Sequence, residues 1–397
     1  MREPKCPYFA SPADSNGRGK CGGCQTQHLE YGLQLENKKK RAQQALKSDD
    51  VNVFSGEEWF YRNRMDMIFT KNGIGFREKG SWKWKVDIEK CAISNHRLNG
   101  LITEVRENFG GIDPFDTKAL TGTYRYAVIR TPQNDSSISF VLNKDSTRCG
   151  EAVERIKEFS RKTTANNIIV TYIPKNTDVS TGTDFVVIKG TDMLEETFLG
   201  KIFRYSAQGF FQNNHEMAER MHLYVNEVLS KHANKLENRK SKIEKNAEFQ
   251  NSNFKPHLLD LYGGVGTFGI INADLFKTVK TVESFEGCVE AAKANIELNG
   301  VKNTEAILLD AMHLKKLDLQ SPLFVITDPP RSGMHQKTIE QLIVLKPELL
   351  VYISCNISQL EKDLPKFLKH YKLKSAAIFD LFPQTNHMET VVELVKS

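Results

Sequence analysis

The chain has 397 residues, of which 40% are hydrophobic and 26% are charged, and its formal net charge is +6. This length allows two or three domains, and the composition is that of a soluble globular protein. An apolar leader and a run of about eighteen apolar residues are both missing from the sequence, which excludes a signal peptide and a membrane-spanning helix and predicts a cytoplasmic protein. The 55 Lys and Arg residues suit a polyanionic partner, although such a charge is also typical of a solvated surface.

Residues 1–50 are expected to form a cysteine segment and a basic helix. Cys21 and Cys24 flank two glycines, which let the backbone turn so that both thiolates face one metal centre. Cys6 adds a third thiolate, and Cys91 is the nearest candidate for a fourth. On spacing alone, zinc and an iron–sulfur cluster fit this set equally well.

The helix expected after the cysteines combines a rough apolar stripe with a basic face. The stripe consists of Leu29, Leu33, Leu35, Ala42 and Leu46. The basic face runs from Lys38 to Arg41, and a charge run of this kind is usually a solvated helix face, here with the option of touching phosphate.

Residues 51–204 are expected to form a central, mostly antiparallel β domain that contacts RNA, with one helix near residues 150–163. Short alternating segments separated by Gly, Asn and Asp predict its strands, at 61–70, 73–80, 82–90, 124–131, 137–143, 167–174 and 184–190. Arg62, Arg64, Trp82 and Trp84 combine positive charge with aromatic faces, which suits base stacking and phosphate neutralisation. For the tryptophans, a place in the core of the β domain is an equally good interpretation.

Residues 205–397 are expected to form a catalytic domain. Residues 231–255, rich in Lys, Asn, Glu and Ser, are interpreted as the end of a helix and a solvated insertion whose role the sequence does not reveal. Strands alternating with helices then predict a doubly wound α/β sheet. Its seven strands are expected at 257–262, 278–283, 304–309, 322–327, 348–354, 375–382 and 389–395.

The first of these strands opens a candidate cofactor site. "LLDLYGGVGTFGI" is a strand, a glycine-rich turn and a helix start, in which the backbone can approach a ligand closely. Glu283 ends the second strand, where a carboxylate accepts both ribose hydroxyls of a nucleoside cofactor. Asp310 ends the third and can face an adenine amino group. A dinucleotide requires a different glycine spacing, so S-adenosylmethionine, which carries no phosphate, fits better.

Three later segments point to chemistry on a base. Asp328, followed by two prolines and Arg331, makes a rigid loop after the fourth strand. Cys355 follows the apolar strand "LLVYIS" and precedes a helix, which suits a nucleophile, although a lone cysteine is more often a buried core thiol. Glu389 enters the last strand beside His387. With a nucleophile nearby, this carboxylate is a plausible general base.

The segments "FFQNN", "DLYGGVGTFG", "VESFEG", "DPPRSG", "YISCN" and "HMETVVEL", in this order, resemble the RNA 5-methyluridine (uracil-C5) methyltransferases. "CPYF", "CGGCQTQHLEYGLQLENKK" and "YRNRMDMIF" are similar to the iron–sulfur-containing branch of that family. The N-terminal β-barrel of many relatives is missing from the sequence, which indicates the compact, archaeal-like version. Gly263 also departs from the family, in which a cysteine is frequent at this place.

The resemblance implies a class I (Rossmann-like) methyltransferase fold and a mechanism. Cys355 attacks carbon 6 of a uracil that has left its stack, and Glu389 removes the carbon-5 proton. It implies that a 4Fe-4S cluster is bound by Cys6, Cys21, Cys24 and Cys91. It implies that S-adenosylmethionine is bound by Gln212, Tyr262, Thr267, Glu283, Asp310 and Asp328.

For the substrate, we expect the T-loop of tRNA rather than ribosomal RNA, and we expect a monomer. Two alternatives stay open. One is a methyltransferase that acts on cytosine carbon 5 or on a protein, and the other is a non-catalytic RNA-binding iron–sulfur protein that keeps the methyltransferase fold.

Overall fold

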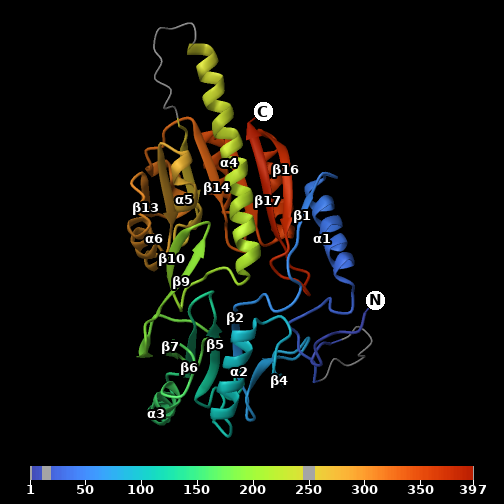
Figure 1. Cartoon of the computed structure of the whole chain (residues 1–397), viewed down its shortest axis with the longest axis vertical. Helices are drawn as coiled ribbons and strands as arrows, with labels where there is room; N and C mark the ends of the chain where they lie inside the picture. Colours follow the sequence, from blue (N-terminus) through green and yellow to red (C-terminus); the bar gives the residue numbers. More distant parts are fainter. Residues whose placement is uncertain (1, 11–18, 245–254, 397) are drawn as a thin grey trace.

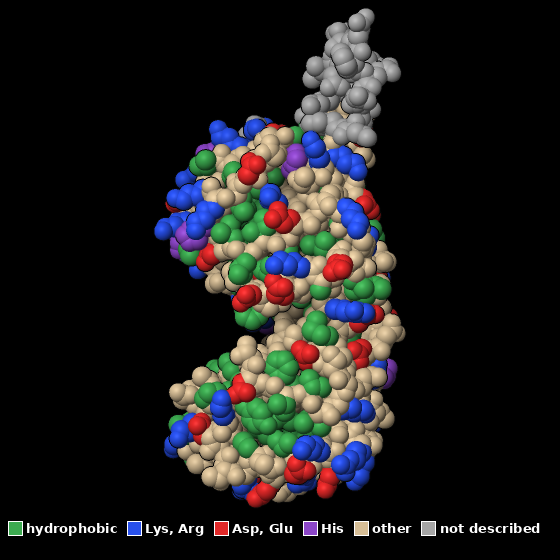
Figure 2. All heavy atoms as spheres, turned by 90° about the vertical axis from the view of Figure 1, so that its left-hand side faces the viewer, with side chains coloured by type: hydrophobic (Ala, Val, Ile, Leu, Met, Phe, Trp, Pro, Cys, Tyr) green, Lys and Arg blue, Asp and Glu red, His purple; other side chains and the backbone are tan. Residues whose placement is uncertain are grey.

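The computed structural model describes residues 2–10, 19–244 and 255–396, which form two lobes stacked along the long axis (Figure 1). The upper lobe is built on an eight-stranded sheet, the lower lobe on a seven-stranded sheet, and a two-stranded hairpin lies between them. The molecule is hollowed between the lobes, as Figure 2 shows from the left-hand side of Figure 1. Among the described residues we find no helix with the length and apolar character that a membrane span needs.

The upper sheet confirms the predicted α/β class. All seven predicted strands are present, and an eighth, β1 (Asn52–Phe54), pairs in parallel with β16 at the sheet edge. The seven are β11 (His257–Leu261), β12 (Thr278–Glu283), β13 (Thr304–Leu308), β14 (Leu323–Thr327), β15 (Leu349–Ser354), β16 (Tyr371–Phe379) and β17 (Glu389–Lys396). Their order is β1-β16-β17-β15-β14-β11-β12-β13, and β17 alone runs antiparallel to its neighbours.

Helices cover both faces of this sheet. They are α4 (His215–Glu244), α5 (Thr267–Asn272), α6 (Glu286–Leu298), α7 (Gln336–Leu345) and α8 (Ile357–Phe367), with short 3-10 helices at Ala273–Leu275 and Ala311–Lys316. Leu350 and Tyr352 of β15 share a core with α7 and α8, whereas Val351 and Ile353 pack with α4. Every residue of β15 is buried, which explains its unbroken apolar sequence. Helix α4 takes up the start of the predicted insertion, and residues 245–254 lie outside the described residues.

The lower sheet has the order β4-β3-β2-β5-β6-β7-β8 and is antiparallel except where β6 pairs with β7. One face packs on an aromatic core that includes Phe69, Phe109 and Phe140. The predicted strands and α3 are present, whereas helix α2 was not predicted. The elements are β2 (Arg64–Phe69), β3 (Ile74–Arg77), β4 (Lys85–Asp87), α2 (His96–Asn108), β5 (Tyr124–Arg130), β6 (Ser137–Asn143), α3 (Cys149–Ser160), β7 (Asn167–Ile173) and β8 (Phe185–Lys189).

The hairpin of β9 (Met193–Phe198) and β10 (Lys201–Ser206) was also not predicted, and it packs on the upper lobe. The Arg204 backbone N–H donates to Asn295 of α6 at 2.8 Å, and the Asn295 side-chain amide donates back to the Arg204 carbonyl at 3.0 Å. Two segments expected in the central domain, β1 and this hairpin, therefore contact the upper lobe. The division at residues 50 and 204 stays a prediction about folding units.

Helix α1 (Tyr31–Leu46) is present, but it faces the core differently from the prediction. Leu33, expected in the apolar stripe, is 38% exposed. The buried residues are Gln34, Lys38, Ala42, Ala45 and Leu46. Lys38, expected on a solvated face, is buried, and its ammonium nitrogen lies 2.6 Å from a carboxylate oxygen of Asp380. Burial lowers the pKa of Lys38, and the charge of Asp380 opposes that shift.

The β16–β17 loop, which begins at Asp380, is also tied to the N-terminal segment through Gln384. The Gln384 carbonyl accepts hydrogen bonds from the backbone N–H groups of Gln25 and Thr26, at 2.9 and 3.1 Å. Its side-chain oxygen accepts from the amide of Gln34 at 3.0 Å. The segment that carries Cys6, Cys21 and Cys24, three of the four predicted metal ligands, therefore holds the loop that leads into β17.

Replacing Lys38 by Met is expected to lower the free energy of unfolding by about 3 to 5 kcal/mol, because Asp380 is then buried without a counter-charge. Denaturant-induced unfolding measures the change. Lys40→Met, which removes an exposed pair with Glu36 on the same helix, is the control and should have little effect. The double variant Lys38→Met/Asp380→Leu should regain most of the lost stability. A single Lys38→Met variant as stable as the wild type would contradict the importance of the pair.

Candidate active site

The residues predicted to bind cofactor and substrate lie along one edge of the upper sheet. The carboxyl ends of parallel strands meet at one edge, where α/β proteins bind ligands. Tyr262 follows β11, Glu283 ends β12 and Asp310 lies just beyond β13. Asp328 follows β14, and Cys355 follows β15. The strand order β15-β14-β11-β12-β13 places them in one row.

Cys355 and Glu389 are neighbours across the β15–β17 pair. In this antiparallel register Ser354 lies opposite Thr390, and Cys355 and Glu389 are the next residues at the same end. An antiparallel strand begins where its partner ends. The first residue of β17 therefore reaches the edge at which the other strands finish.

Cys355 occupies a half-buried position between β15 and α8. The side chain of Asn356 caps α8 by accepting a hydrogen bond from the backbone N–H of Gln359 at 3.3 Å. Burial raises the pKa of the Cys355 thiol to about 11, and the negative charges of Glu389 and Asp328 add to this shift. The charge of Arg331 opposes it.

Two carboxyl groups beside Cys355 are also perturbed. Burial raises the pKa of Glu389 well above its ordinary value, the charge of Asp328 adds to the shift, and Arg331 opposes it. Burial raises the pKa of Asp328 to about 7. Carboxyl groups whose pKa values are raised by burial, next to a cysteine, are typical of a catalytic site.

All six predicted cofactor residues line two adjoining pockets, with volumes of about 500 and 80 Å³. Tyr262 lines both pockets and marks their junction. Glu283 and Asp310 line the larger pocket. Gln212, Thr267 and Asp328 line the smaller one. This arrangement suits an elongated ligand with one end in each pocket.

The glycine-rich turn between these pockets restricts side chains for two reasons, which are lack of space at Gly263 and a left-handed backbone at Gly264. A Cβ atom at Gly263 would lie 2.3 Å from Cγ2 of Thr281, so a larger residue requires a change at Thr281. Gly264 has a φ of +54°, and its N–H donates to Glu283 at 3.3 Å. Tyr262 has a φ of 60°, a left-handed conformation that is unfavourable for residues other than glycine. Such strain is concentrated at ligand sites.

Three further residues at this edge were not assigned a role from the sequence. Asp260 is buried beneath the turn and accepts a hydrogen bond from the N–H of Gly269 at 3.0 Å. His222 lines the smaller pocket, and burial lowers its pKa to about 3. The position of His222 on the apolar face of α4 does not indicate a functional role in the sequence. The sequence does indicate a role for Arg331, because this residue lies in the rigid loop after Asp328.

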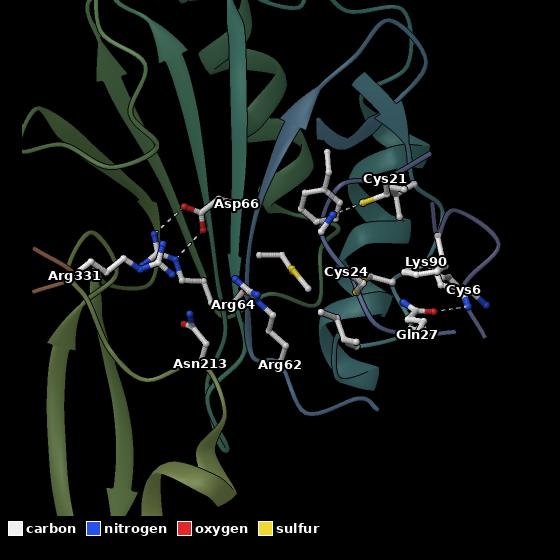
Figure 3. A pocket seen from close by; sticks show the side chains of 18 residues that line it. Cys6, Cys21, Cys24, Gln27, Arg62, Arg64, Asp66, Lys90, Asn213 and Arg331 are labelled. Atoms are coloured by element: carbon white, nitrogen blue, oxygen red, sulfur yellow. Dashed lines mark hydrogen bonds and ion pairs between the residues drawn. The ribbon is translucent and has the colours of Figure 1, made fainter. Parts of the chain in front are cut away.

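The four predicted metal ligands, Cys6, Cys21, Cys24 and Cys91, line one cavity of about 630 Å³ (Figure 3). Their thiols are free. Within the described ranges, no group of three or more Cys, His, Asp or Glu side chains is gathered as the ligands of one metal ion would be. The structure thus brings the four cysteines to one cavity without forming a single-ion site.

The same cavity extends to the active site. Arg62, Arg64 and Arg331 line its other end, and Figure 3 shows Arg331 reaching toward Arg64 and Asp66. Arg64 is held by Asp66, with 2.8 Å between guanidinium nitrogen and carboxylate oxygen. Cationic groups from both lobes therefore line this end of the cavity, and one of them, Arg331, also acts on the Cys355 thiol.

Comparisons with known proteins agree with this geometry. The family model described as tRNA (Uracil-5-)-methyltransferase matches residues 30–397. A tRNA (uracil(54)-C(5))-methyltransferase of Pyrococcus abyssi is 30% identical over 397 residues, which cover 99% of this chain and 86% of that protein. A protein of Caldanaerobacter subterraneus, named as an uncharacterized RNA methyltransferase, is 30% identical and is covered to 85%.

A solved structure is similar over most of its length. The crystal structure of the Pyrococcus abyssi tRNA (uracil-54, C5)-methyltransferase in complex with S-adenosyl-L-homocysteine matches with a TM-score of 0.75 and 28% identity. The match covers 94% of this chain and 86% of that one. The chain therefore belongs to the tRNA (uracil-5-)-methyltransferase family.

Proposed function

We propose that this protein transfers a methyl group from S-adenosylmethionine to carbon 5 of a uridine in tRNA. The observation that carries the proposal is the pairing of Cys355 with Glu389 at the sheet edge that also holds the cofactor pockets. The relatives named for uracil 54 of tRNA favour that position as the target. A cytoplasmic monomer remains our expectation.

The two pockets fit a cofactor made of a nucleoside and an amino acid. S-adenosylmethionine supplies a methyl group on a positively charged sulfur. In the larger pocket, Glu283 accepts hydrogen bonds from the ribose hydroxyls and Asp310 faces the adenine. In the smaller pocket, Gln212 and Thr267 hold the methionine end, and the carboxyl of Asp328 attracts the sulfonium.

Cys355 starts the reaction, because carbon 5 of uracil is too electron-poor to attack a methyl group unaided. The thiolate adds to carbon 6 and forms a carbon–sulfur bond, which moves the electrons of the ring double bond onto carbon 5 and its neighbouring carbonyl. Carbon 5 then bonds to the methyl carbon, whose bond to the sulfonium sulfur breaks. Arg331, which opposes the rise in the thiol pKa, favours the thiolate.

Glu389 ends the reaction as the general base. It removes the proton that remains on carbon 5, the double bond forms again, and the bond between carbon 6 and sulfur breaks to release the thiolate. A raised pKa suits this role, because a carboxylate in an apolar site is a stronger base than one in water.

We further propose that Cys6, Cys21, Cys24 and Cys91 bind a 4Fe-4S cluster with a structural role. Support comes from their common cavity of about 630 Å³. A single zinc ion with bonds of about 2.3 Å would draw the sulfurs to about 3.8 Å from one another. A cluster keeps its ligands farther apart, because several iron atoms lie between them.

The variant Glu389→Gln is expected to stall after methyl transfer, because Gln has nearly the shape of Glu but cannot take the carbon-5 proton. With tRNA and methyl-labelled cofactor, a protein–RNA adduct that carries the label should survive denaturing electrophoresis. Cys355→Ala, which should keep its cofactor affinity, is the control and should form neither adduct nor product. Normal turnover by Glu389→Gln, or an adduct without label, would show that another group takes the proton.

Replacing Glu283 by Ala should weaken S-adenosylmethionine binding by about 1.5 to 3 kcal/mol, the range for hydrogen bonds to a charged group. Titration calorimetry measures the change. Glu290→Ala, which removes an exposed carboxylate from α6, is the matched control and should bind normally. Equal affinities for both variants would remove Glu283 from the ribose site.

Protein purified without oxygen is expected to contain iron and acid-labile sulfide in equal amounts. Cys24→Ser should lose most of both, whereas Cys149→Ser, at a thiol outside the cavity, should keep them. Iron and sulfide analysis with visible absorption spectra makes the comparison. Zinc in place of iron would contradict the proposed 4Fe-4S cluster but would still support a metal site formed by these cysteines.

A further inference from the structure

Two tryptophans stand in solvent on the loop between β3 and β4, here called the tryptophan loop (Glu78–Trp84). Trp82 is 78% exposed and Trp84 is 58% exposed. The structure thus decides between the two interpretations left open by the sequence, because neither ring belongs to the core of the lower lobe. Exposed apolar side chains that lie close together can mark a binding site.

Both rings are held in place by cations. The guanidinium of Arg77 lies 4.6 Å from the centre of the Trp82 ring and also hydrogen-bonds the Trp82 carbonyl. Arg77 is itself fixed by Asp178, at 2.6 Å. The ammonium of Lys83 lies 4.7 Å from the centre of the Trp84 ring. The rings are therefore presented in defined positions, so little conformational entropy is lost when a ligand stacks on them.

The loop backbone is ordered by its own hydrogen bonds. The hydroxyl of Ser81 accepts from the N–H groups of Lys83 and Trp84, at 3.2 and 3.0 Å. The N–H of Glu78 donates to the Trp84 carbonyl at 2.9 Å and closes the loop. These contacts distinguish the loop from a flexible connection.

The charge of this region favours a nucleic acid. Residues 77–85 contain the four cations Arg77, Lys79, Lys83 and Lys85 and the single carboxylate Glu78. Lys79 and Lys83 are exposed. Exposed aromatic rings among cations are the usual means by which proteins stack bases and neutralise phosphates together.

The cysteine segment supports the tryptophan loop from behind. The N–H of Gly22 donates to the Arg77 carbonyl at 3.1 Å, and the N–H of Lys79 donates to the Lys20 carbonyl at 2.9 Å. A Cβ atom at Gly22 would lie 3.2 Å from Cα of Lys79, so the two backbones are in close contact. The turn between Cys21 and Cys24 therefore positions the loop.

A continuous surface joins the tryptophan loop to the active site. A pocket of about 490 Å³, lined by Arg77 and Trp82, shares Gly23 and Phe76 with the cavity of the cysteines. That cavity ends at Arg331, beside Cys355. The tryptophan loop and Arg331 therefore adjoin the same cavity.

We propose that the tryptophan loop is a second docking surface for the RNA substrate, on which unpaired bases stack while the target uridine occupies the active site. The proposal rests on the proposed function and adds to it a surface outside the catalytic edge. It also gives the cysteine segment a task, which is to position this loop.

Substitution of the two rings tests the proposal. Trp82→Ala and Trp84→Ala should each raise the Kd for substrate tRNA by roughly 5- to 150-fold, the equivalent of one lost stacked base. The rate at saturating tRNA and the affinity for S-adenosylmethionine should stay unchanged. Phe at either position keeps a stacking face and should restore most of the affinity. Val344→Ser on α7, where the side chain is 78% exposed, is the matched control and should bind like the wild type.

Tryptophan fluorescence gives a second readout, because the chain has only three tryptophans. Trp59 is half-buried beneath Arg2 and Lys5, so Trp82 and Trp84 should account for the quenching that tRNA causes. The double variant Trp82→Phe/Trp84→Phe should bind tRNA with little quenching.

The outcomes separate the two proposals. If the wild type methylates tRNA and the alanine variants bind it with unchanged Kd, the proposal of a docking surface is wrong and the proposed function is unaffected. If the wild type neither binds nor methylates any tRNA, the proposed function fails. A change in sedimentation mass of the alanine variants, with unchanged RNA affinity, would assign the loop to protein contacts and overturn the proposal.

Discussion

The buried ion pair between Lys38 and Asp380 connects the two ends of the sequence. Lys38 comes from α1, and Asp380 begins the loop that leads to Glu389. A movement of the helix or the loop would separate the two buried charges, and a buried charge without its partner is energetically costly. The pair therefore restricts the loop that leads to β17, whose register with β15 places its first residue beside Cys355. The hydrogen bonds of Gln384 tie the same loop to the cysteine segment.

Much of the catalytic lobe could be predicted from the sequence, because its central strands β14 and β15 are buried on both faces and appear as apolar runs between helical segments. The residues just after such strands share one edge of the sheet. Glu283, Asp310, Asp328 and Cys355 could therefore be selected from position alone. Glu389 was selected through the family resemblance and its place at the start of the last strand. The antiparallel direction of β17, which brings it to Cys355, is not contained in the sequence pattern.

Other features could not be predicted, for different physical reasons. Strand β1 is too short to show a period. The residues around Lys38 do not distinguish a buried lysine from a solvated one, because its partner, Asp380, lies 342 residues away. The exposure of Trp82 and Trp84 depends on the twist and packing of the whole lower sheet. Helix α2 is different, since Leu98, Leu101, Ile102 and Val105 have helical spacing and Asn95 caps the first turn. The sequence therefore does contain a signal for this helix.

The position of β17 also matters while the chain is being synthesised. This strand lies between β15 and β16, both of which precede it in the sequence. Until the ribosome has made β17, the sheet is split, and β15 and β16 each present an unpaired edge to other chains. The same strand begins with Glu389, the proposed general base. Closure of the sheet, protection of these two edges and completion of the proposed catalytic pair therefore all depend on the last strand of the chain to be made.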